Sequence, residues 1–374
     1  MASGTSNLAS LVALGGFVLA FIFGAVANRT NFCTMGAVSD VVNMGSWGRM
    51  RMWLLAIAVA ILGTHALQLG GLIDLTKSFY VRPNVTWLSY VLGGFLFGVG
   101  MTLGSGCGSK TLVRLGAGSL KSLVVFIFLG IAAYMTLKGL FAIWRINWID
   151  PVATDLTRSN VSRQDLPTLI SAWTGANLVT VELLVALAVA GALLVFVFKD
   201  REFRSSFDHI LGGTVVGLVV VGGWNVTGHL GFAENPQTLE DTFFGTNSRT
   251  IESLSFTAPV GYVLELLMLW SDKSLTVTFG IAATLGIIAG SFAYALASRT
   301  FRWEGFAGAE DTANHVIGGL LMGFGGVTAL GCTIGQGLTG FSTLALGSIL
   351  AFVAIVAGSA LTMKIQYWRM TRDG

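Results

Sequence analysis

Three cysteines, Cys33, Cys107 and Cys332, are the side chains whose type and spacing could do chemistry in this sequence. Each follows a glycine by nine residues, at Gly24, Gly98 and Gly323. A thiol is a weak hydrogen-bond donor with a soft, polarizable sulfur, so a row of thiols suits an anion that ends in sulfur better than it suits sulfate. The cysteines are odd in number, lie far apart and form no Cys-x-x-Cys pair, so we expect neither a disulfide framework nor a metal site.

Polar side chains accompany the three cysteines. Hydroxyl and amide groups that can donate to an oxyanion stand beside them at Asn31, Thr34, Ser105, Ser109, Thr333 and Gln336. A glycine-rich turn precedes each short segment, and a half-helix that starts there would point free N–H groups into the interior, where such termini bind anions. We therefore predict a substrate site formed by these residues and the three cysteines.

Simpler interpretations compete at several of these positions. A single membrane cysteine is most simply a small buried hydrophobe, although three of three at one position of a repeat favour a function. Lys110 and Arg114 could attract an anion at a cytoplasmic mouth, or they could be ordinary interfacial cations. Glu182 and Glu265 lie in or near apolar segments and could couple proton movement, or they could simply mark helix ends.

The cysteines belong to an internal repeat. Residues 93–118 recur as residues 318–343 at a constant offset of 225, and looser copies end at Cys33 and at Val226, where the cysteine is missing. Each copy is a glycine-rich apolar helix followed by a break. Glycine costs roughly 1 kcal/mol per position in a soluble helix. In a membrane it lets helices approach closely, and paired breaks in two halves indicate a transporter's binding site.

The composition predicts an all-α polytopic membrane protein. The 374 residues are 53% hydrophobic and only 11% charged, with a mean hydropathy of +0.74. The net charge of +3 gives no reason to expect a nucleic-acid partner. Spans of about 20 apolar residues begin near nine positions: Leu8, Met52, Trp87, Ser119, Ala176, His209, Leu275, Asn314 and Ser342. We expect about nine transmembrane helices plus short re-entrant half-helices.

The distribution of basic residues predicts the topology. Clusters at residues 49–51, 199–204 and 364–372 favour the cytoplasm, which leaves the N-terminus outside and the C-terminus inside if residues 258–270 do not cross. The breaks at Cys107 and Cys332 then follow helices of opposite direction. We therefore expect a single transport domain over residues 1–374, with a first half at 1–204 and a second, inverted half at 205–374.

The sequence resembles the YeeE/YedE family of bacterial sulfur-transport membrane proteins over nearly its whole length. The resemblance is most specific at residues 31–36, 104–108 and 331–337. It implies thiosulfate uptake through the bacterial inner membrane, without a cofactor and with one cysteine in each of three equivalent loops along a central path, here Cys33, Cys107 and Cys332. It also implies that a TusA-like cytoplasmic sulfur carrier, where one takes part, is a separate polypeptide.

Three functional hypotheses follow. The leading one is a permease, not an enzyme, that passes thiosulfate from thiol to thiol by hydrogen bonds without covalent change. The second is a membrane sulfurtransferase that uses a cysteine persulfide, although only Cys107 has the nearby basic residues that favour a thiolate. The third is a transporter or channel for another sulfur or selenium compound, or for another small solute.

Overall fold

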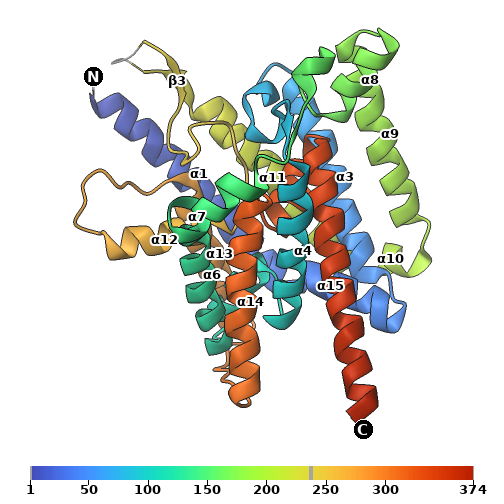
Figure 1. The fold of residues 1–374 in the computed structure, drawn as a ribbon, viewed down its shortest axis with the longest axis vertical. Helices are drawn as coiled ribbons and strands as arrows, with labels where there is room; N and C mark the ends of the chain where they lie inside the picture. Colours follow the sequence, from blue (N-terminus) through green and yellow to red (C-terminus); the bar gives the residue numbers. More distant parts are fainter. Residues whose placement is uncertain (1, 236–238, 374) are drawn as a thin grey trace.

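The computed structural model describes residues 2–235 and 239–373 and consists almost entirely of helices (Figure 1). Within the described residues, eight helical stretches are long and apolar enough to cross a membrane. They contain α1 (Ala2–Arg29), α3 (Gly48–Leu69), α4 (Trp87–Leu103), α6 (Leu120–Lys138), α9 (Leu178–Phe198), α11 (Phe207–Asn225), α13 (Phe279–Ala297) and α15 (Leu346–Asp373). The prediction of an all-α polytopic membrane protein is confirmed.

The remaining predicted span, which begins near Asn314, forms helix α14 (Ala309–Thr328). Its length of 20 residues suffices for a crossing, but its first two turns carry Glu310, Asp311 and His315, so it is not among the eight apolar stretches found in the described chain. The helix nevertheless lies inside the bundle, where it packs along α4 and α6. Its lower hydropathy is therefore a property of one end, and its glycine-rich remainder is buried.

Short elements connect the long helices. The three cysteine-containing breaks lead into α2 (Thr34–Ser39), α5 (Gly108–Gly116) and the π-helix η7 (Gly335–Gly340), which correspond to the expected half-helices. The remaining helical elements are η1 (Asp40–Met44), η2 (Leu75–Lys77), η3 (Phe79–Val81), α7 (Leu140–Trp144), η4 (Arg145–Ile149), η5 (Leu156–Ser159), α8 (Leu166–Thr174), α10 (Arg201–Ser205), η6 (Val226–Leu230) and α12 (Ala258–Met268).

The two ends of the bundle differ. We call the end where α1 begins and where β3 and α8 lie the N-terminal face, and the end where α15 finishes the C-terminal face (Figure 1). Two small antiparallel sheets are present in the described residues. Strands β1 (Asn84–Val85) and β2 (Thr154–Asp155) form one, and β3 (Phe232–Glu234) and β4 (Asp241–Phe243) form the other.

Helix α12 does not cross the bundle. It has 11 residues, and the chain enters and leaves this segment at the same face. The amide of Phe244 donates to the carbonyl of Gly231 at 2.8 Å, and the amide of Phe279 donates to Gly245 at 2.7 Å, so α13 begins where α11 ends. The expectation that this segment turns back without crossing therefore agrees with the structure.

Glycines set the close approach of helices from different repeat copies. A Cβ added at Gly93 would lie 2.6 Å from the Ala329 nitrogen, and one added at Gly100 would lie 2.7 Å from the Gly318 carbonyl oxygen. Later residues of α4 thus meet earlier residues of α14, so the two helices run antiparallel. Helices α1 and α11 are also antiparallel, because Gly15 meets Val226 and Gly222 meets Leu19.

Other helix pairs join a helix of one repeat copy to the long helix that follows another copy, and these pairs run parallel. A Cβ at Gly94 would lie 2.7 Å from the Ala351 carbonyl oxygen, and one at Gly98 would lie 2.1 Å from that of Ile355, so α4 and α15 are parallel. Glycines four residues apart on α11 likewise meet carbonyls four residues apart on α3, and those on α14 meet α6 in the same way, so these pairs are also parallel. Glycines eight residues apart on α1 meet carbonyls eight residues apart on α13, which makes that pair parallel as well. This arrangement is what inverted halves require, and the division into residues 1–204 and 205–374 stays a prediction.

Candidate functional site

The three breaks share one backbone geometry. The second residue before each cysteine has a left-handed conformation, with φ of 52° at Asn31, 56° at Ser105 and 59° at Leu330. The residue after it sends its amide back to the helix: Phe32 to Ala27 at 3.1 Å, Gly106 to Met101 at 2.9 Å and Gly331 to Gly326 at 2.8 Å. This is the Schellman helix ending, here without glycine at the left-handed position.

The fourth copy lacks this ending. Helix α11 continues from Asn225 directly into the π-helix η6, and Val226 stands within that continuous run. The copy that lacks a cysteine in sequence therefore also lacks the break. This correlation connects the break to the cysteine, since both are present together at three positions and absent together at the fourth.

Each cysteine begins the next short helix and is buried. Cys33 and Cys107 have extended backbone conformations at the N-terminal caps of α2 and α5, and the amide of Gly36 donates to the Cys33 sulfur at 3.4 Å. The Cys332 sulfur accepts from the amides of Gly335 at 3.4 Å and Phe256 at 3.3 Å. The exposed fractions of the three cysteines are 5%, 1% and 0%.

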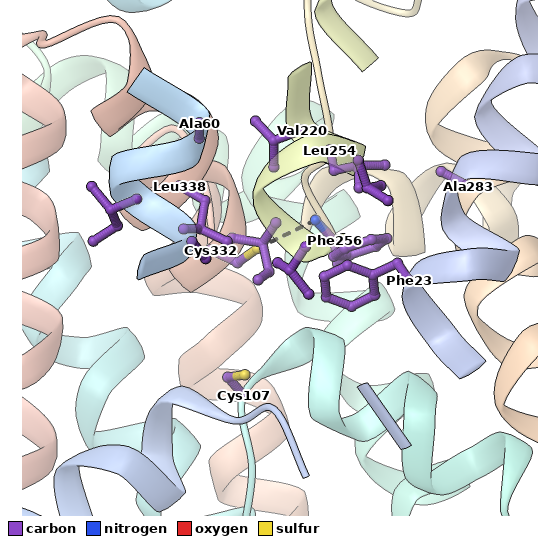
Figure 2. Packing of buried hydrophobic residues seen from close by; sticks show 14 of the residues in the cluster. Phe23, Ala60, Cys107, Val220, Leu254, Phe256, Ala283, Cys332 and Leu338 are labelled. Carbon is purple, nitrogen blue, oxygen red and sulfur yellow. Dashed lines mark hydrogen bonds between the residues drawn. The ribbon is translucent and has the colours of Figure 1, made fainter. Parts of the chain in front are cut away.

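The three cysteines converge near the centre of the bundle. Cys33 and Cys107 lie close enough to influence each other electrostatically, and Ser109 Oγ lies 3.3 Å from the Cys107 sulfur. The Thr333 hydroxyl lies near Cys107 as well, without a hydrogen bond between them. Figure 2 shows Cys107 on one side of the Cys332 loop and Phe256 beside Cys332. Breaks from both halves of the chain therefore meet at one place.

Several polar atoms at this place have no partner among the described residues. They are the hydroxyls of Thr34 and Thr333 and the side-chain oxygen of Gln336, whose amide nitrogen donates to the Ala329 carbonyl. All three side chains are at least 98% buried. A buried polar atom without a hydrogen bond costs about 1–3 kcal/mol. These oxygens lie beside the cysteine breaks and are free to accept or donate a hydrogen bond, so they are suited to bind a ligand.

The predicted residues Asn31 and Ser105 lie elsewhere. Asn31 is exposed, and its side-chain oxygen accepts from Lys110 Nζ at 3.3 Å. Ser105 is half-buried and holds the left-handed position of its break, and its carbonyl accepts from Arg114 at 3.1 Å. These two residues therefore shape the breaks and the mouth, whereas Thr34, Ser109, Thr333 and Gln336 lie at the buried centre.

Cavities approach this centre from both faces. On the N-terminal face a cavity of about 230 Å³ reaches the Cys332 break at Leu330 and Gly331. On the C-terminal face two cavities of about 330 and 580 Å³ share Asn31 in their walls. Apolar side chains, including Phe23, Leu254, Phe256 and Leu338, surround Cys332 between them (Figure 2).

The two cations predicted at the mouth differ in their contacts. Lys110 lines the 330 Å³ cavity, and its recorded hydrogen bond is the one to Asn31. Arg114 lines the same cavity but also bonds the Ser105 carbonyl and pairs with Glu304 at 3.2 Å. Burial acts to raise the pKa of Glu304, but Arg114 beside it holds that pKa below its usual range. Arg114 therefore supports the break itself.

The two acidic residues considered for proton coupling are paired within the protein. Glu182 lies 2.9 Å from His65 Nδ1, which joins α9 to α3. Glu265 accepts from the Tyr134 hydroxyl at 2.7 Å and from Lys138 Nζ at 3.2 Å, which joins α12 to α6. Each pair connects a helix to its neighbour, away from the three breaks.

Sequence reasoning missed the segment that approaches Cys332 from outside the repeat. The amide of Phe256 binds the thiol, and Glu252 and Arg145 line the cavity above it. These residues lie in connections between repeat copies and carry no motif. Their only signal is that an acidic residue at 252 lies six positions before the apolar segment of α12.

Comparison with known proteins identifies the family of this chain. Residues 29–361 match the family described as "Sulphur transport". The chain is 27% identical over 374 residues to the thiosulfate transporter TsuA of Escherichia coli (strain K12), covering 96% of each protein. It is 26% identical over 348 residues to the thiosulfate transporter TsuA of Spirochaeta thermophila, covering 92% of this chain and 96% of that one. With the cysteine breaks at its centre, this membrane protein belongs to the sulphur transport family.

Proposed function

We propose that this protein carries thiosulfate inward across the bacterial inner membrane, passing it along Cys332, Cys107 and Cys33. The observation that carries the proposal is the meeting of three buried thiols between cavities on opposite faces. The unpartnered oxygens of Thr34, Thr333 and Gln336 stand beside these thiols and would complete the path. The names of the two relatives support thiosulfate as the substrate.

The chemistry of the thiols fits transport of a divalent anion. An unpaired charge cannot enter an apolar interior without a cost of many kcal/mol. Thiol donors are weak, so several of them at successive depths lower this barrier without holding the anion too tightly. Adequate but weak binding at several sites is also what lets ions leave a channel filter. Transfer from one sulfur to the next needs no covalent change.

The direction of transport rests on the predicted topology. Basic residues gather at the C-terminal face, which favours a cytoplasmic position for that face and an external N-terminus. In this orientation the cavity above Cys332 opens outward, and the cavities at Asn31 open inward. The antiparallel packing of α4 against α14 supports the inverted halves. A TusA-like cytoplasmic carrier stays a prediction of the resemblance.

The experiment is uptake of labelled thiosulfate into sealed proteoliposomes. The Cys107→Ala, Cys332→Ala double variant should lose uptake, whereas Val353→Ala, a change on an exposed part of α15, should keep it. Excess sulfate should inhibit the wild type only weakly, because sulfate offers no terminal sulfur to the thiols. Normal uptake by the double variant would contradict the relay.

The test also separates the alternatives. Because both relatives are transporters, the family relationship favours transport over the sulfurtransferase. A cysteine-bound persulfide, detected by mass spectrometry during uptake, would favour the sulfurtransferase nonetheless. Absence of wild-type uptake in vesicles that take up another sulfur or selenium anion would assign a different substrate.

A further inference from the structure

The cavity on the N-terminal face contains an acidic residue where an anion must pass. Glu252 lines this cavity together with Arg145, Ser248 and Tyr262. Among the described residues that line it, Arg145 is the only cation. The Nε atom of Arg145 has no hydrogen-bond partner, and its guanidinium lies 3.7 Å from Asp150. One cation that can receive an anion thus shares a small space with one carboxyl group.

Glu252 is joined directly to the Cys332 site. Four residues further along the chain, the amide of Phe256 binds the Cys332 sulfur. The segment between them is fixed, because Ser253 donates to the Val220 carbonyl at 2.7 Å and Thr339 donates to the Leu254 carbonyl at 2.7 Å. Glu252 therefore stands at a set position on the approach to the first thiol.

The surroundings of Glu252 give its carboxylate little support. Among the described residues only Ser248 donates to it, with its hydroxyl at 2.6 Å and with its backbone amide, and none forms a salt bridge with it. Besides Arg145 in the same cavity wall, the titratable groups near it are Tyr80 from η3 and Tyr262 from α12, both uncharged at neutral pH. Arg249, on its own loop, is exposed. Burial raises the pKa of Glu252 to about 7, against the opposing effect of Ser248.

We infer that Glu252 is a proton-controlled gate for anion entry: its carboxylate repels a doubly charged, sulfur-terminated oxyanion from this cavity, and its protonated form admits the anion to Arg145 and Cys332. A neutral carboxyl group can also donate a hydrogen bond to the anion, which the carboxylate cannot. Thiosulfate itself keeps its two charges throughout the neutral range, so the pH dependence belongs to the protein. The inference deepens the proposed function and rests on it.

The test is the pH profile of thiosulfate uptake into proteoliposomes, with the pH of the medium varied and the internal pH buffered. For a group with a pKa of about 7, wild-type uptake should fall roughly tenfold between about pH 6 and pH 8. Glu252→Gln, which mimics the protonated group, should vary less than about twofold and should exceed the wild type at the alkaline end. Glu234→Gln, an exposed acid on β3, is the matched control and should behave like the wild type.

A second variant keeps the carboxyl group. Because Ser248 stabilises the carboxylate, Ser248→Ala should raise the pKa of Glu252 and move the midpoint of uptake to higher pH by roughly 0.5–1 unit. If Glu252→Gln does not fold, the shift of the midpoint in Ser248→Ala still tests whether Glu252 controls uptake.

The outcomes distinguish the two proposals. Wild-type uptake that is equal at all pH values, or a Glu252→Gln variant that retains the tenfold fall, would overturn the gate and leave the proposed function in place. A midpoint that Ser248→Ala does not move would also overturn the gate. No wild-type uptake at any pH would overturn the proposed function instead.

Discussion

The backbone amide of Phe256 donates a hydrogen bond to the Cys332 sulfur at 3.3 Å, although 76 residues separate them in the sequence (Figure 2). Gly335 donates to the same sulfur at 3.4 Å. Two amides thus occupy the lone pairs of the sulfur, and the thiol proton is left free to be donated. We therefore expect Cys332 to act as a donor toward a ligand.

Replacing Cys332 by serine should separate folding from transport. The serine oxygen can still accept the amides of Phe256 and Gly335, so the melting temperature in detergent should change by only a few degrees. Uptake should fall at least roughly tenfold, a barrier increase of about 1.4 kcal/mol, because the soft sulfur that matches the substrate is lost. Uptake equal to that of the wild type would show that sulfur itself is not required.

Two buried threonines should respond in opposite ways to the same substitution. Thr333→Val removes a hydroxyl without a partner, so the free energy of unfolding should rise by about 1 kcal/mol while uptake falls. Thr339→Val removes the donor to the Leu254 carbonyl, so the protein should be destabilised by about 1–3 kcal/mol. Thermal unfolding and uptake, measured on both variants, check this contrast. A destabilised Thr333→Val would mean that its hydroxyl is satisfied in the resting protein.

The effect of a glycine-to-alanine substitution on stability should depend on the contacts between helices and not on the helix propensity of the residue. At Gly98 the new Cβ would lie 2.1 Å from the Ile355 carbonyl oxygen, so α4 and α15 must separate and the protein should lose roughly 2–4 kcal/mol of stability. At Gly191, on α9, nothing lies within 4 Å. Alanine there should leave stability unchanged or raise it by up to about 1 kcal/mol. Equal effects at the two sites would contradict the packing described for α4.

The two cations at the C-terminal face should differ in what they affect. Lys110→Met should leave the melting temperature nearly unchanged and reduce uptake several-fold, with a weaker dependence on salt than the wild type, because a mouth charge attracts anions at a distance. Arg114→Met removes the bond to the Ser105 carbonyl and the pair with Glu304, so it should lower the yield of folded protein. A stable Arg114→Met and an unstable Lys110→Met would reverse the assignment of the two roles.

The helices and the breaks could be predicted from the sequence because their signals are local. Runs of about 20 apolar residues mark spans, and the recurrence of glycine nine residues before each of Cys33, Cys107 and Cys332 marks the breaks. Helix α14 differs in hydropathy only because Glu310, Asp311 and His315 occupy its first turns. The left-handed residues could not be foreseen, since Asn31, Ser105 and Leu330 share no side-chain property.

The meeting of distant segments could not be predicted, because it depends on packing between elements far apart in the chain. The sequence places Thr333 beside Cys332, but the fold turns its hydroxyl toward Cys107. The contact of Phe256 with Cys332 involves a loop without any repeat signal. Glu252 is one of several acids in a polar stretch, and only the cavity around it distinguishes it from Glu234.

The unbroken fourth copy has a consequence for direction. A pore with identical halves would look the same from either face and would pass its solute equally well both ways. Because α11 continues through Val226, the break at Cys33 has no mate, whereas those at Cys107 and Cys332 form a pair. We therefore expect the two entrances to present different affinities to the same anion. Such a difference would make the protein rectify, with unequal saturated fluxes from the two faces although the equilibrium is unchanged.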